Sequence, residues 1–75
     1  MQLDATAVHT KITCDRLVVA FADGRELAVP LAWFPRLQDA TGDQRRNWRL
    51  TGGGRGIHWP DIDEDVSVAS LLRTV

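Results

Sequence analysis

The stretch VVAFADGREL (residues 18–27) places an Asp-Gly pair inside an alternating apolar run, and its register governs the fold of the chain. A two-residue turn at positions 23–24 would pair Ala20 with Leu27 and mix a solvent-facing position with a core-facing one. A three-residue turn over residues 22–24 keeps the apolar residues on one face and ends in a left-handed residue, which Gly24 supplies without a Cβ penalty. This stretch therefore predicts a β-hairpin with three pairs: Phe21 with Arg25, Val19 with Leu27, and Leu17 with Val29.

Strand-like alternation extends to both sides of this hairpin. Residues 8–14 carry apolar side chains at Val8, Ile12 and Cys14, so we expect a further short strand before a break near residues 15–16. This pattern predicts that the Cys14 thiol is buried as a small hydrophobe. After the hairpin, Pro30 cannot donate a hydrogen bond to a sheet ladder, so the strand ends there or lies at an edge.

Helical spacing begins after this strand. Because Pro35 is tolerated only in the first turn of a helix, we expect a short helix that begins near residues 32–33 and ends at residues 41–42. Thr41 is a suitable N-cap for a second short helix over residues 42–48. The spacing therefore predicts two short helices in succession.

The C-terminal third combines a glycine-rich connection with one strand and one helix. The strand is expected at residues 56–60, followed by an acidic loop. Asp65 or Ser67 is a suitable cap for the last helix. Its apolar residues predict a buried stripe of Val68, Leu71 and Leu72.

The fold class follows from these elements. We expect residues 1–75 to form one α+β domain, with a small antiparallel sheet of about three to four strands and short helices packed on one face. A chain this short buries only about 60% of its unfolded surface, so small domains often gain stability from a disulfide, a metal or a second subunit. Cys14 is the only cysteine, which excludes a disulfide within the chain. We therefore expect a homo-oligomer.

Composition restricts the location and the partners. A lone cysteine is typical of a reducing, cytoplasmic setting. Residues 1–10 have neither the apolar region nor the basic region of a signal peptide, and no run approaches the roughly 20 apolar residues of a membrane span. The formal net charge of −1 argues against bulk attraction to nucleic acid or anionic lipid.

Opposite charges are nevertheless segregated along the chain, and we interpret them as a recognition surface. Arg and Trp are the residue types enriched at interface hot spots. At helical spacing Arg45 and Arg49 share a face, whereas Trp48 is either a core or an interface residue. The predicted partner-binding residues are Arg45, Arg46, Trp48, Arg49, Arg55, Asp61, Asp63 and Glu64.

The acidic run at residues 61–65 has three interpretations. It can cap the last helix, or it can pair with the arginines of the same chain or of a neighbouring chain. As a calcium loop it lacks the glycine and the distal glutamate that such a loop requires. We therefore predict no metal site there.

The sequence offers little for catalysis. His9 and His58 are far apart in the chain, and Cys14 has no neighbouring base, so neither a zinc site nor a nucleophile–base pair is predicted. The glycines of residues 52–56 precede a strand rather than a helix, which excludes a phosphate-binding loop. We expect no cofactor and no enzymatic activity.

Three motifs resemble the bacterial domain-of-unknown-function family 2442. They are F-x-D-G-R at residues 21–25, W-F-P-R-L at residues 33–37 and I-H-W-P-x-x-D-E-D at residues 57–65. The resemblance spans roughly residues 8–72 and implies a compact α+β domain. It also implies a partner-binding, antitoxin-like role beside a small toxin.

We therefore expect a non-catalytic protein-binding module. The alternative is a nucleic-acid-binding regulator, acting alone or with that partner. Such a regulator would show a strongly salt-dependent affinity, because phosphate contacts release counterions.

Overall fold

The predicted hairpin forms with the predicted register. In the computed structural model, which describes residues 5–74, strand β2 (Arg16–Phe21) pairs with β3 (Glu26–Pro30) through Leu17–Val29 and Val19–Leu27. The Phe21 N–H donates to the carbonyl of Arg25 at 2.9 Å. Gly24 has a φ of +91°, the left-handed conformation that closes the three-residue turn.

Strand β1 (Ala7–Ile12) completes a three-stranded antiparallel sheet in the order β1-β2-β3. Pro30 both ends β3 and lies on an edge strand, as expected for a residue without an N–H. The prediction for Cys14 is wrong, because β1 ends at Ile12 and the chain turns at residues 13–15. Cys14 lies in this turn with its side chain exposed.

The helical region after β3 is interrupted at Phe34, the residue before Pro35. A 3-10 turn (Leu31–Trp33) precedes α1 (Pro35–Gln38), and between them Phe34 has φ −127° and ψ 79°. A proline disfavours the helical conformation in the residue before it, so α1 begins later than the predicted residues 32–33.

Helix α2 (Gly42–Arg46) has the predicted N-cap, Thr41. It ends before residue 48, at an Asn47 with φ −91° and ψ 74°. Arg45 and Arg49 therefore do not share a helical face.

A second antiparallel sheet contains β4 (Arg49–Thr51), β5 (Gly56–Trp59) and β6 (Glu64–Ser67) in that order. The α+β class is confirmed, but the strands form two sheets instead of one. The sequence predicted only β5 of these three. All three residues of β4 are exposed and β6 buries only Val66, so neither strand carries a repeated apolar signal.

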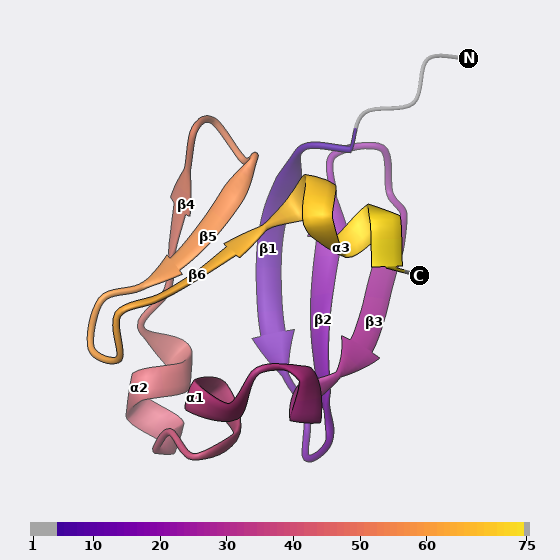
Figure 1. The fold of residues 1–75 in the computed structure, drawn as a ribbon. Coiled ribbons are helices and arrows are strands. Elements are labelled where there is room, and N and C mark those ends of the chain that lie inside the picture. The colour runs from indigo at the N-terminus through magenta and orange to yellow at the C-terminus, as the bar shows by residue number, and fades with distance from the viewer. Residues whose placement is uncertain (1–4, 75) are drawn as a thin grey trace.

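Helix α3 (Val68–Thr74) crosses the first sheet, whereas α1 and α2 lie beyond the end of that sheet (Figure 1). The Ser67 hydroxyl accepts from the Ser70 N–H at 3.4 Å, so Ser67 and not Asp65 lies at the helix start. Val68 and Leu71 are buried as predicted. Leu72 is 40% exposed, and this part of the predicted stripe is wrong.

Both sheets and α3 contribute to one hydrophobic core. Its largest fully buried side chain is Trp59 of β5, and the same core contains Leu17, Val19, Leu31 and Leu37. A main-chain hydrogen bond joins the two sheets, from the Ala7 N–H of β1 to the Gly54 carbonyl at 2.8 Å. Another joins the start of α3 to the second sheet, from the Val68 N–H to the Arg55 carbonyl at 3.0 Å. No helix within residues 5–74 is long and apolar enough to cross a membrane.

Candidate partner-binding site

A cleft of about 480 Å³ lies between β1 and α2. One wall is residues 9–12 of β1, and the other consists of Gly42, Arg45 and Arg46 of α2 with Trp48 beyond it. The ionisable side chains among these lining residues are Lys11, the two arginines and His9, and no carboxylate lines the cleft. We refer to it as the basic cleft.

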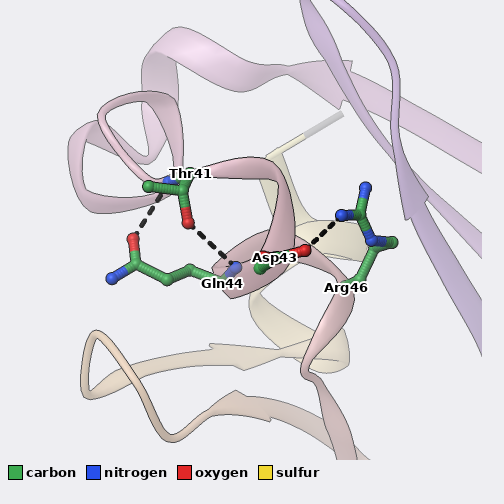
Figure 2. Close-up of polar contacts among 4 residues, drawn as sticks. All are labelled: Thr41, Asp43, Gln44 and Arg46. Atoms are coloured by element: carbon green, nitrogen blue, oxygen red, sulfur yellow. Dashed lines mark hydrogen bonds and ion pairs between the residues drawn. The ribbon is translucent and has the colours of Figure 1, made fainter.

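Helix α2 is held in place by local hydrogen bonds that its sequence dictates. The Thr41 hydroxyl accepts from the Gln44 N–H at 3.1 Å, and the Gln44 side chain accepts from the Thr41 N–H at 2.9 Å (Figure 2). This reciprocal capping box satisfies two main-chain donors at the helix start. Arg46 pairs with Asp43 on the same helix (Figure 2), and its side chain is 74% exposed.

Arg45 has a structural role in addition to lining the cleft. Its guanidinium donates to the carbonyls of Leu37 at 2.9 Å and Gln38 at 2.7 Å, at the C-terminal end of α1. Its own carbonyl accepts from the buried Trp59 indole at 3.1 Å. Arg45 therefore connects α1, α2 and β5.

Trp48 lies between the hydrophobic core and the basic cleft. It is partly buried against the hydrophobic core, and it also lines the basic cleft. His9 meets its ring edge-on, with ring centroids 5.3 Å apart and an interplanar angle of 80°. The sequence did not indicate His9 or Lys11 as site residues, because only the packing of α2 beside β1 brings them to the cleft.

The acidic run forms the turn between β5 and β6 and the first residues of β6. It lies next to the segment that follows α2. Asp61 accepts from the Asn47 side chain at 3.0 Å, and Asp65 of β6 contacts the His58 ring at 2.8 Å. The carbonyl of Asp63 accepts from Arg36 at 2.7 Å. Within residues 5–74 no carboxylate of this run pairs with an arginine side chain.

The remaining predicted residues divide between two places. Arg49 lies on β4 opposite His58 and is exposed. Arg55 lies at the other end of the second sheet, in a separate hollow with Thr6 and Leu72. The structure thus brings Arg45, Arg46 and Trp48 together with Lys11 at the basic cleft, and we refer to this cleft and the neighbouring Asp61 of the acidic turn as the bipolar face. Arg49 and Glu64 lie on opposite faces of the second sheet, because Arg49 pairs with His58 and Glu64 pairs with the buried Trp59. Arg55 lies outside the bipolar face.

A family model described as "Protein of unknown function (DUF2442)" matches residues 5–75. The chain belongs to the DUF2442 family. Its fold is similar to a crystal structure of a protein of unknown function from Rhodospirillum rubrum ATCC 11170, with a TM-score of 0.78 and 26% identity. That alignment covers 93% of this chain and 87% of the other. A comparison with curated proteins gives no match.

The three motifs on which the resemblance of this DUF2442 protein rests lie at turns in the structure. In F-x-D-G-R, the Asp23 carboxylate accepts from the Arg25 N–H at 3.0 Å and pairs with its guanidinium at 2.7 Å. W-F-P-R-L contains the break before α1, and I-H-W-P-x-x-D-E-D forms the β5–β6 hairpin. Lys11 and Trp48 of the cleft lie outside these motifs.

Proposed function

We propose that this DUF2442 protein is a non-catalytic module that binds a protein partner, in the manner of an antitoxin that binds a small toxin. The observation that supports the proposal is the bipolar face, where the basic cleft lies beside the acidic β5–β6 turn. Trp48 gives this face a rigid aromatic surface, and the exposed Arg46 adds a charged group to the same cleft. A reducing cytoplasmic location fits the exposed thiol of Cys14.

Nucleic-acid binding is the second candidate. An aromatic ring among cationic side chains suits the stacking of bases on a single strand, and the basic cleft has this composition. The adjoining acidic turn and the net charge of −1 oppose a polyanion. A protein partner carrying both signs of charge is therefore favoured.

Affinity purification with paired variants tests the proposal. We expect the tagged wild-type chain to capture one small protein stoichiometrically from its native host at low and moderate salt. Reversing two charges, Arg46→Glu at the basic cleft and Arg49→Glu on the neighbouring strand β4, should abolish that capture. Arg55→Glu is the control, because it makes the same change of charge as each of these substitutions but at the other end of the second sheet. It should leave capture intact.

Two results would contradict the proposal. One is equal capture by the wild type and the double variant with an unchanged circular dichroism spectrum. The other is co-purified nucleic acid that elutes as salt rises, which would favour the second candidate.

A further inference from the structure

Two strong hydrogen-bond donors in the basic cleft are unused. Within residues 5–74, neither the ammonium of Lys11 nor the indole N–H of Trp48 has a hydrogen-bond acceptor. By contrast, the indole N–H of Trp59 donates to the Arg45 carbonyl. Residues that line the cleft therefore carry two donors that no acceptor among residues 5–74 uses.

The positive charge of the cleft is only partly compensated by carboxylates among residues 5–74. Arg45 donates only to neutral main-chain carbonyls, and Lys11 has no carboxylate partner among the described residues. Arg46 alone is paired, with Asp43. An acceptor that carries negative charge would satisfy both the free donors and the excess positive charge.

We infer that the basic cleft binds a carboxylate side chain on a segment of the protein partner, so that the partner's glutamate or aspartate accepts from Lys11 and from the Trp48 indole. This inference rests on the proposed function and names the chemistry of its partner. An apolar neighbour in the same segment would lie against the Trp48 and His9 rings, which already stand edge-on to each other.

A carboxylate on a peptide fits better than the phosphates of a nucleic acid. Asn47 adjoins Trp48 in the chain and holds the carboxylate of Asp61 at 3.0 Å, so negative charge lies beside the cleft. The successive phosphates of a nucleic-acid strand would be repelled by this negative charge. A peptide can carry an acidic residue in the cleft and basic residues next to Asp61, so its charges can complement both.

The test is a titration of the full ¹⁵N-labelled chain, followed at the Trp48 indole resonance by NMR. The probe is a twelve-residue peptide of alternating glutamate and leucine, and its control replaces every glutamate by glutamine. The glutamate peptide should shift the Trp48 resonance to saturation and the glutamine peptide should not. Lys11→Gln should weaken binding about fivefold, which corresponds to the loss of one solvent-exposed ion pair.

Arg55→Gln is the matched control, because it removes one cation outside the cleft and should leave the affinity unchanged. Equal shifts with both peptides, or equal weakening by both variants, would overturn the inference. Tighter binding of oligo-dT, with a steep loss as salt rises, would also overturn it and assign the cleft to single-stranded nucleic acid.

The two proposals fail separately. If charge reversal at Arg46 and Arg49 abolishes partner capture but Lys11→Gln and the peptides have no effect, only the inference about the cleft is wrong. If the glutamate peptide binds as expected and no protein is captured from the host, the proposed function is wrong and the carboxylate site stands.

Discussion

At the scale of single residues, two glycines have positive φ for different reasons. Gly24 has a φ of +91° in a turn where an added Cβ would meet nothing within 4 Å. Gly54 has a φ of +96° where an added Cβ would lie 2.6 Å from the Ala7 carbonyl oxygen and would also overlap Thr6. Gly24 is thus required by conformation alone, and Gly54 by conformation and by close approach to β1.

Alanine substitutions should separate these two effects. Gly24→Ala should lower the free energy of unfolding by about 1–2 kcal/mol, the cost of a left-handed alanine. Gly54→Ala should cost about 2–4 kcal/mol, because overpacking adds to the conformational term. Urea unfolding checks both, and an unchanged midpoint for Gly24→Ala would contradict the three-residue turn.

At the scale of elements, α2 has only five residues and cannot be stable through helix propensity alone. Two sets of contacts hold it: the capping box of Thr41 and Gln44, and the bonds from Arg45 to α1. One side of the basic cleft therefore depends on hydrogen bonds of Thr41 and Gln44, which do not line the cleft, and of Arg45, which does.

Removing the cap should weaken the domain without altering a charged residue of the site. Thr41→Ala should lower the free energy of unfolding by about 1 kcal/mol, and Thr41→Ser should restore most of it because serine keeps the accepting hydroxyl. Chemical denaturation of the three proteins measures this. Equal stability of the alanine and serine variants would show that the hydroxyl contributes nothing.

Arg45 should differ from the other arginines of the predicted surface. Arg45→Gln should cost about 1–2 kcal/mol of stability, because the carbonyls of Leu37 and Gln38 lose a charged donor. Arg49→Gln should change stability by about 0.5 kcal/mol or less, since this side chain is exposed on β4. Thermal melts of both variants would contradict this interpretation if the two losses were alike.

At the scale of the whole molecule, Trp59 joins the two sheets. Its ring is fully buried in the common core, and its N–H donates to the main chain of α2. Trp48 packs against that core from the cleft side, whereas Trp33 is 48% exposed. The three tryptophans therefore occupy three environments, which the sequence alone left undetermined.

Truncation at these positions should follow burial. Trp59→Ala should cost about 3–5 kcal/mol, a large fraction of the roughly 5–15 kcal/mol that stabilises a small domain. Trp33→Ala should cost about 1 kcal/mol or less, since nearly half of that side chain is already in water. Urea midpoints followed by circular dichroism test the order, and a larger loss at Trp33 would contradict the assignment of the core.

The sequence by itself determined the features that depend on neighbouring residues. The register of β2 and β3, the end of β3 at Pro30 and the Thr41 cap all follow from side-chain alternation or turn chemistry within a few positions. The break before Pro35 also has a local cause, the steric effect of a proline on the residue before it. We nevertheless predicted a helix that continues through this position.

Tertiary structure alone decided the second sheet and the cleft. Strands β4 and β6 are held in the sheet by main-chain hydrogen bonds to β5, and most of their residues are not buried. Their sequences therefore need little apolar alternation and give little signal for a strand. Cys14 is exposed and not in the core, because a turn at residues 13–15 ends the apolar alternation of β1 before it. Lys11 and Trp48 line one cleft because packing brings together segments that are far apart in the chain. The periodicity of a sequence indicates only the direction of a side chain within its own helix or strand, so it could not predict this cleft.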